Sequence, residues 1–238
     1  MYLRPLQTSL AALLMASLAA CGADAPTPAP ESETVATPEL EAPLPVVGPE
    51  RVILAFGDSL FAGYDLAEDE GYPEQLEDVL RARGINARVI DAGVSGDTTA
   101  AGAQRIGFVL DNAGVVPELA IVELGGNDLL RAIAPSQTRA NLTAILTELQ
   151  RREIPVLLMG MRAPPNMGAQ FQAEFDALYP ELAEQFGVPL VPFFLDSVYA
   201  RPELILPDRI HPTAQGVETL VAATVDDVVG ALPDSPAS

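Results

Sequence analysis

Residues 51–60 read Arg-Val-Ile-Leu-Ala-Phe-Gly-Asp-Ser-Leu, an almost unbroken apolar run that ends in a small, polar turn. Apolar residues that continue without alternation, as from Val52 to Phe56, are typical of a strand covered on both faces. Four similar runs follow, and longer stretches with helical spacing lie between them. This alternation predicts right-handed crossovers and a parallel sheet between two helical layers, which is a three-layer αβα fold.

Five strands are expected, each short and rich in apolar residues: Arg51–Phe56, Ala87–Asp91, Leu119–Leu124, Pro155–Gly160 and Pro189–Pro192. The helices expected between and after them are Pro73–Arg83, Thr98–Asn112, Ser136–Arg152, Ala169–Phe186 and a last helix after Pro212. Ser136 is the expected N-cap of its helix, and the fixed φ of Pro212 suits a first helical turn. Because ligands bind beyond the carboxyl ends of parallel strands, polar residues that directly follow a strand are the candidates for a site.

The beginning of the chain has the composition of a targeting segment. A short basic start precedes the apolar run Leu10–Ala20, which is too short to span a membrane as a helix. The run ends in Leu-Ala-Ala-Cys at residues 18–21, which resembles the lipobox of bacterial lipoproteins. We therefore expect residues 1–20 to be a lipoprotein signal peptide and Cys21 to carry the lipid. The alternative is that Cys21 is simply a small buried or free thiol.

That resemblance implies a location in the bacterial cell envelope, as a periplasmic lipoprotein. Gly22 follows the cysteine where an aspartate would favour retention at the inner membrane, which suggests outer-membrane anchoring. Residues 21–49 are mostly Ala, Pro, Thr and Glu and contain no aromatic residue, so we expect an extended tether. Residues 50–233 are expected to form the folded domain, and residues 234–238 a short tail.

The charge of the chain excludes several kinds of partner. It contains 33 acidic residues against 13 basic ones, all of them arginine, and its formal net charge is −20. Such a chain repels phosphate backbones, so nucleic acid is not an expected partner. One Cys and one His leave no room for a zinc cluster or an internal disulfide. We expect no metal, no cofactor and a monomeric protein.

A serine and a histidine stand where hydrolytic chemistry needs them. Ser59 directly follows the first expected strand, at a turn whose backbone N–H groups can stabilise a negatively charged oxygen. His211 is the one histidine of the chain, and imidazole is the usual acceptor of a serine proton, with an ordinary pKa of roughly 6.5. Asp208 lies three residues earlier and can fix the imidazole tautomer. Taken singly, an N-cap serine or an exposed histidine would be unremarkable structural features.

Two further turns offer donors for an oxyanion hole. Residues 94–99, Val-Ser-Gly-Asp-Thr-Thr, follow the second expected strand and present the Gly96 N–H without a side chain in the way. Residues 123–128, Glu-Leu-Gly-Gly-Asn-Asp, follow the third strand and supply the Asn127 amide. Either turn alone could be an ordinary Gly- or Asn-rich loop. All of these motifs, however, fall at one edge of the predicted sheet.

Together these blocks resemble the SGNH or GDSL hydrolases, and within them the thioesterase I, lysophospholipase L1 and arylesterase branch. The matching motifs are GDSL, SGDTT, ELGGND, LYPELAEQFGVPLVPFF and DRIHP, which begin at residues 57, 95, 123, 178 and 208. The resemblance implies a flavodoxin-like sheet with strand order 2-1-3-4-5. It also implies that Ser59 attacks, His211 transfers protons and Asp208 orients His211. The Ser59 and Gly96 N–H groups and the Asn127 amide would hold the oxyanion.

The expected activity is that of a serine esterase acting on carboxylic esters or thioesters through an acyl-Ser59 intermediate. Aryl esters, lysophospholipids and acyl thioesters are the substrate classes that the resemblance implies. Two alternatives remain: an O-deacetylase of envelope carbohydrate, and a non-catalytic lipid-binding lipoprotein. Two departures from the family pattern bear on specificity: Arg209 stands where relatives often have glycine, and Ala163 is expected at a wall of the acyl pocket.

Overall fold

Five parallel strands form one sheet in the order β2-β1-β3-β4-β5. The computed structural model describes residues 46–234. The strands are β1 Arg51–Gly57, β2 Ala87–Gly93, β3 Leu119–Glu123, β4 Val156–Met159 and β5 Leu190–Val191. The predicted α/β fold is confirmed, and the strand order is the one that the family resemblance implies. Since all strands are parallel, their carboxyl ends lie along a single edge, where the candidate residues are expected.

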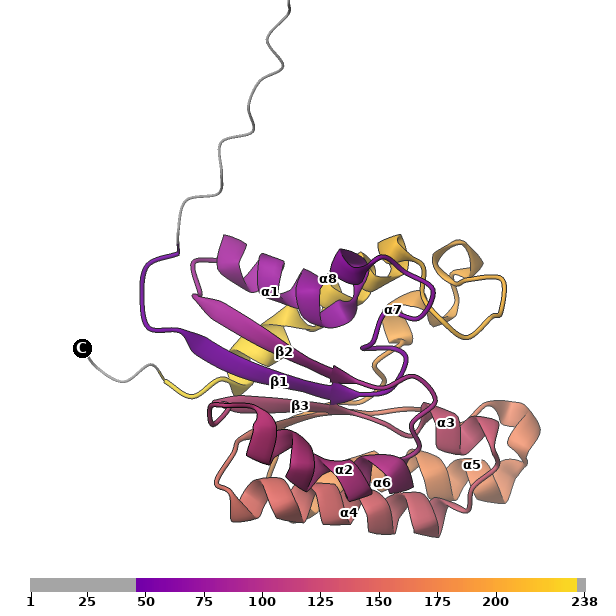
Figure 1. Cartoon of the computed structure of the whole chain (residues 1–238). Helices are drawn as coiled ribbons and strands as arrows, with labels where there is room; N and C mark the ends of the chain where they lie inside the picture. Colours follow the sequence, from indigo (N-terminus) through magenta and orange to yellow (C-terminus); the bar gives the residue numbers. More distant parts are fainter. Residues whose placement is uncertain (1–45, 235–238) are drawn as a thin grey trace, which may run out of the picture. The chain divides into compact units, whose positions relative to one another are not determined.

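Helices cover both faces of the sheet (Figure 1). On one side lie α1 Tyr72–Ala82, α7 Asp196–Tyr199 and α8 Ala214–Ala231. On the other side lie α2 Thr99–Asn112, α4 Pro135–Arg151, α5 Ala169–Asp176 and α6 Leu178–Phe186. The short helix α3, Gly126–Leu130, follows β3. Single turns of 3-10 helix occupy η1 Glu68–Glu70, η2 Pro165–Met167 and η3 Pro202–Leu204.

The core forms on both sides of the central strands because their residues alternate between two covered faces. Every residue of β1 and β3 is buried. Behind the carboxyl end of β1, the Phe61 ring stacks on Tyr72 at 4.8 Å between ring centroids, and both rings meet Phe194 edge-on. The Tyr72 hydroxyl is 2.7 Å from the hydroxyl of Thr224, which joins α1 to α8. This aromatic cluster gives the turn that carries Ser59 a rigid support.

Three details differ from the predicted helices. The expected helix Ala169–Phe186 is two helices, because Pro180 has no N–H to donate to the Asp176 carbonyl and its ring crowds that carbonyl. Ser136 is not an N-cap, because α4 already begins at Pro135. The last helix begins at Ala214, and Thr213 caps it by accepting from the Gly216 N–H.

The described residues begin and end close to each other in space. The Arg51 guanidinium donates to the Pro233 carbonyl at 2.6 Å, which ties the first strand to the residues after α8. The predicted signal peptide, Cys21 and nearly all of the predicted tether lie outside the described residues. Within residues 46–234, no helix has the length and hydropathy needed to cross a membrane.

Candidate active site

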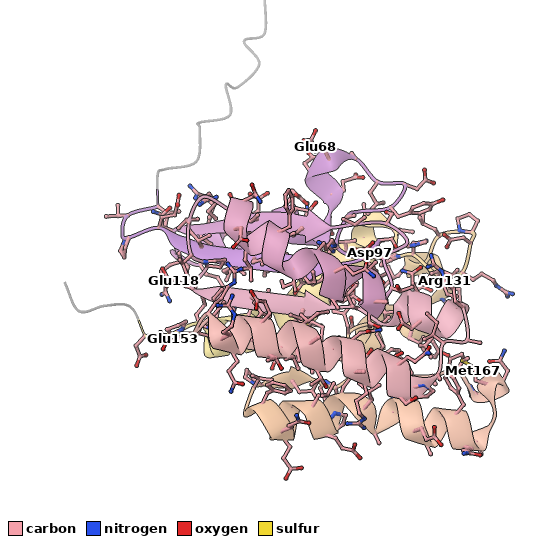
Figure 2. The ribbon with its side chains drawn as sticks, turned by 60° about the horizontal axis from the view of Figure 1, so that its bottom comes forward. Glu68, Asp97, Glu118, Arg131, Glu153 and Met167 are labelled. Carbon is pink, nitrogen blue, oxygen red and sulfur yellow. The ribbon has the colours of Figure 1, made fainter. Side chains whose placement is uncertain are left out.

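The candidate residues gather beyond the carboxyl ends of the strands. Residues before β3 and β4, Glu118 and Glu153, lie at one end of the molecule in Figure 2, whereas Asp97 after β2 and Arg131 after α3 lie at the other. Ser59 follows β1 by two residues at this second end. The sheet therefore brings loops that are distant in sequence to one edge.

The structure brings Ser59 and His211 together across 152 positions of sequence. The Ser59 Oγ lies 2.8 Å from Nε2 of His211, and Nδ1 of His211 lies 2.6 Å from Oδ2 of Asp208. Ser59 is 8% exposed, and the His211 side chain is 14% exposed. A carboxylate that accepts from Nδ1–H leaves Nε2 as the basic nitrogen, directed at the serine hydroxyl.

Local hydrogen bonds hold the loop that carries His211. The Leu206 N–H donates to the His211 carbonyl at 2.7 Å, and the Arg209 N–H donates back to the Leu206 carbonyl at 2.9 Å. Arg209 has φ of 63°, in the left-handed region that favours glycine over residues with a side chain. The Thr213 N–H donates to the Leu204 carbonyl at 2.9 Å. This closed loop places the imidazole over the end of β1.

The charge of Asp208 is stabilised by its surroundings. Partial burial alone would raise the pKa of this carboxyl, but hydrogen bonds from the His211 ring and from the N–H groups of Ile210 and His211 outweigh burial and lower it. The side chain is 34% exposed, so water also solvates the carboxylate. Asp208 therefore stays ionised next to the imidazole.

A second, buried pair of carboxyl groups lies behind Ser59. Asp58 Oδ1 accepts from the Leu60 N–H at 3.0 Å, and Oδ2 accepts from the Asn127 amide at 3.0 Å. Burial raises the pKa of Asp58 against these hydrogen bonds. Burial and the neighbouring charge of Asp58 raise the pKa of Glu123 well above its usual range. Because Asp58 has the donors and Glu123 has none for its Oε1, we assign the proton of the pair to Glu123.

The loop after β2 is fixed from two sides. Gly96 has φ of 85°, and its carbonyl accepts from the Arg131 guanidinium at 2.8 Å. Arg105 bonds Asp97 at 2.5 Å and the Gly57 carbonyl at 2.8 Å, so α2 is tied to the end of β1. The N–H groups of Ser59 and Gly96 donate to no other residue in the part of the chain that the structure describes. Both are available to an oxygen that develops negative charge.

A second tie links this loop to Asn127. The Asp128 carboxylate accepts from the N–H of Thr99, at the start of α2, at 2.9 Å and from the Thr138 hydroxyl at 2.9 Å. The neighbouring Gly125 has φ of 121°, and any side chain there would collide with the Tyr179 hydroxyl. Asn127 directly precedes the anchored Asp128, and its amide is directed toward Asp58.

A cavity of about 310 Å³ opens beside Ser59. Ser59, Asp58 and Asn127 line it, and so do two arginines, Arg162 and Arg209. Its remaining walls are largely apolar and include Leu60, Leu129, Leu130, Met161, Phe193, Leu195, Tyr199, Ile205 and Ile210. Such walls suit a hydrocarbon or aromatic group next to the reactive hydroxyl. Gly96 does not line this cavity.

Sequence reasoning missed several residues at the site. The Tyr64 ring stacks on the His211 imidazole at 4.3 Å between centroids, and no pattern in the sequence indicates this. The sequence also gives no sign that Asp58, within the GDSL motif, accepts a hydrogen bond from the Asn127 amide. The expectation for Ala163 was wrong: Ala163 is buried and is not among the residues that line the cavity. Its N–H donates to Asp176 and its carbonyl accepts from Gln172.

Comparison with known proteins gives consistent matches. Residues 55–218 match the model of the GDSL-like lipase/acylhydrolase family. The chain is 35% identical over 177 residues to an arylesterase of Vibrio mimicus, covering 74% of this chain and 88% of that protein. It is 39% identical over 160 residues to thioesterase 1/protease 1/lysophospholipase L1 of Escherichia coli K12, covering 67% of this chain and 74% of that protein.

A solved structure agrees with these matches. AlinE4, described as an SGNH-hydrolase family esterase, is 66% identical and superposes with a TM-score of 0.67, covering 79% of this chain and 99% of AlinE4. The family match spans both the turn that carries Ser59 and the loop that carries His211. From its sequence, its sheet and these matches, the chain belongs to the GDSL-like lipase/acylhydrolase family of SGNH hydrolases.

Proposed function

We propose that the protein is a serine esterase that hydrolyses carboxylic esters or thioesters through an acyl-Ser59 intermediate. One observation carries the proposal: the Ser59 hydroxyl lies 2.8 Å from an imidazole whose other nitrogen is 2.6 Å from a carboxylate. Ester-bond hydrolysis is also the activity named for the relatives. The two alternatives, a glycan O-deacetylase and a non-catalytic lipid-binding protein, are not favoured by those names.

The geometry supports an acyl transfer in two halves. His211 Nε2 takes the Ser59 proton while Oγ forms a bond to the carbonyl carbon, and the carbonyl electron pair moves onto oxygen. Collapse of this intermediate expels the alcohol or thiol, which takes the proton from His211. Water then attacks the acyl-Ser59 in the same way and gives a proton to His211. The second intermediate collapses to the free acid, the bond to Ser59 Oγ breaks, and His211 returns the proton to Oγ.

Three donors are proposed for the oxyanion: the N–H groups of Ser59 and Gly96 and the side-chain amide of Asn127. The two N–H groups have no acceptor among the described residues. Asn127 gives one amide hydrogen to Asp58, and its second hydrogen is available to the substrate. Fixing the amide in advance avoids reorganisation when charge develops on the substrate.

The apolar walls of the cavity favour aryl esters, lysophospholipids or acyl thioesters as substrates. The names of the relatives, arylesterase and thioesterase 1/lysophospholipase L1, support the same range. Release of acetate from an acetylated glycan, at a higher kcat/KM than hydrolysis of any of these three classes, would instead support the deacetylase.

Replacement of the nucleophile tests the proposal. Ser59→Ala is expected to abolish hydrolysis of 4-nitrophenyl acetate and labelling by a fluorophosphonate probe. Ser95→Ala, which changes the neighbouring serine of the loop after β2, is expected to retain most of both. Full turnover by Ser59→Ala would contradict the assignment of the nucleophile. Failure of the wild-type protein to react with the probe would revive a non-catalytic role.

The envelope location is part of the proposal and rests on residues 1–22 alone. Cys21 would carry the lipid anchor, and residues 21–49 would connect it to the hydrolase domain. Metabolic labelling with a palmitate analogue in a bacterial host is expected to mark the wild-type chain and not Cys21→Ala. Equal labelling of both chains would contradict the anchor at Cys21. The predicted monomer can be checked by sedimentation of residues 46–238.

A further inference from the structure

Two arginines differ from the others in the described part of the chain. The others bond a carboxylate, a side-chain amide or a backbone carbonyl, as in the pairs Arg51–Glu118 and Arg139–Glu181. Within residues 46–234, the side chains of Arg162 and Arg209 form neither an ion pair nor a hydrogen bond. Arg162 only lies over the Phe193 ring, with its Cζ 5.7 Å from the centroid.

Both of these arginines line the cavity that contains Ser59. They come from separate segments, Arg162 from the loop after β4 and Arg209 from the loop that carries His211. Arg162 also lines an adjoining hollow with Asp176 and Asp196, and it pairs with neither carboxylate. In a chain with 33 acidic residues, two cations beside the reactive hydroxyl are thus left without an internal counter-charge.

The backbone at Arg209 adds a second observation. Its φ of 63° is a conformation that a glycine would adopt at lower energy. A long cationic side chain is nevertheless present at this position, and Arg209 is one of the residues that line the cavity. The folded structure therefore accepts backbone strain to hold a guanidinium beside the apolar walls. Guanidinium groups bind phosphate and carboxylate oxygens through paired N–H donors.

We propose that Arg162 and Arg209 form an anion-binding subsite. The preferred substrate is then an ester or thioester whose acid part is apolar and whose alcohol or thiol part carries a phosphate group. This inference rests on the proposed function and adds the charge of the substrate to it. The apolar walls take the hydrocarbon, and the two guanidinium groups take the phosphate at the rim of the same cavity. A neutral ester would use only the first of these interactions.

Two sources of phosphate fit this chemistry, a lysophospholipid headgroup and the nucleotide part of a coenzyme thioester. Matched pairs of substrates separate them. The first pair is 1-hexanoylglycerol 3-phosphate and 1-hexanoylglycerol. The second pair is hexanoyl-coenzyme A and hexanoyl-N-acetylcysteamine, which lacks the phosphates. In each pair, the ratio of kcat/KM for the phosphorylated member to that for the neutral member measures the contribution of the anion.

The wild-type ratio is expected to exceed one for at least one pair, and that pair identifies the source of the phosphate. Arg162→Gln/Arg209→Gln is expected to lower this ratio about tenfold, the scale of two screened charge interactions at a protein surface. The charge-retaining variant Arg162→Lys/Arg209→Lys is expected to keep most of the preference. Arg139→Gln removes the same charge away from the cavity and serves as the matched control, with an unchanged ratio.

Salt gives an independent readout. The net charge of −20 repels an anionic substrate, and the two arginines oppose that repulsion locally. Added NaCl screens both effects. It is therefore expected to lower the kcat/KM ratio of phosphorylated to neutral substrate in the wild-type protein, where attraction is screened. In the double glutamine variant, where only repulsion remains, NaCl is expected to raise this ratio. An unchanged ratio in the double variant, or a wild-type ratio below one for both pairs, would overturn the subsite. If the wild-type protein hydrolysed none of these substrates, and no neutral aryl ester either, the result would instead contradict the proposed function.

Discussion

Ser59 and His211 meet at the active site, but two contrasting regions of the molecule hold them. The Ser59 side is the buried end of β1 and β3, supported by the rings of Phe61 and Tyr72 and by strand register. The His211 side is a surface loop, closed by its own backbone hydrogen bonds and strained at Arg209. The sheet provides a rigid position, whereas the loop depends on local bonds within residues 204–213.

The two regions also shift the pKa values of their carboxyl groups in opposite directions. Behind Ser59, burial raises the pKa values of Asp58 and Glu123. On the loop, donors to Asp208 outweigh burial and lower its pKa. Asp208, which must stay charged during turnover, thus lies near water. Of the buried pair, Asp58 accepts from the Asn127 amide and so fixes its direction. This difference leads to four predictions.

The largest effect is expected on the loop side. In Asp208→Asn, the amide would donate to His211 Nδ1, so Nε2 would carry the proton and could not accept one from Ser59. We expect kcat for an aryl ester to fall by about 10³- to 10⁴-fold. Asp69→Asn, which changes an exposed carboxylate on η1, is the control and should not alter kcat. A loss below tenfold would show that Asp208 does not set the tautomer.

On the sheet side, Asn127→Ala removes one proposed oxyanion donor. The barrier is expected to rise by about 3 kcal/mol, or roughly 10²-fold in kcat, with a much smaller change in KM. Steady-state kinetics with an aryl ester would measure both quantities. An unchanged kcat would remove Asn127 from the site and leave it as a structural partner of Asp58.

A smaller effect is expected from Glu123→Gln and depends on pH. Because the folded-state pKa of Glu123 is raised, its contribution to stability is fully present below its ordinary pKa and is lost as pH rises toward the folded-state value. The variant does not titrate, so its stability relative to the wild type should improve by on the order of 1 kcal/mol between pH 5 and pH 8. Urea unfolding at both values measures this, with Glu184→Gln as an exposed control. A pH-independent difference would mean that Glu123 is not the protonated member of the pair.

The smallest effect is expected at the strained loop residue. Arg209→Gly should stabilise the fold by about 0.5–1 kcal/mol, because the relief of left-handed strain exceeds the added entropy of the unfolded chain. Arg201 has an ordinary φ of −122°, so Arg201→Gly should instead destabilise the protein by a similar amount. Urea midpoints of the two variants would test this contrast, and destabilisation of both would show that the loop is not strained at Arg209.

Much of the fold could be predicted from apolar runs alone. All five expected strands are present within a few residues, because buried parallel strands need continuous apolar sequence. Helix ends were less predictable: the break before Leu178 follows from Pro180, and α3 is too short for a helical repeat to reveal. The order of the strands came from the family resemblance and not from the pattern.

The site was only partly predictable for a similar reason. Ser59, Asp208 and His211 could be found because each belongs to a recognisable motif with its own chemistry. The buried pair depends on strand register, since the pairing of Phe56 with Val122 is what places Glu123 next to Gly57 and Asp58. Cavity walls likewise come from loops folded over one another, and the mistaken expectation for Ala163 shows that adjacency in sequence does not determine which side chain faces a cavity.

The separation of 152 positions between Ser59 and His211 has a consequence for biosynthesis. A ribosome delivers the chain from its amino end, so the nucleophile emerges long before its base. Until the last helix and the loop before it have left the ribosome, the nascent polypeptide contains a serine with no group to accept its proton. The pair of side chains that this chemistry needs is therefore complete only when nearly the entire domain has been synthesised and has folded.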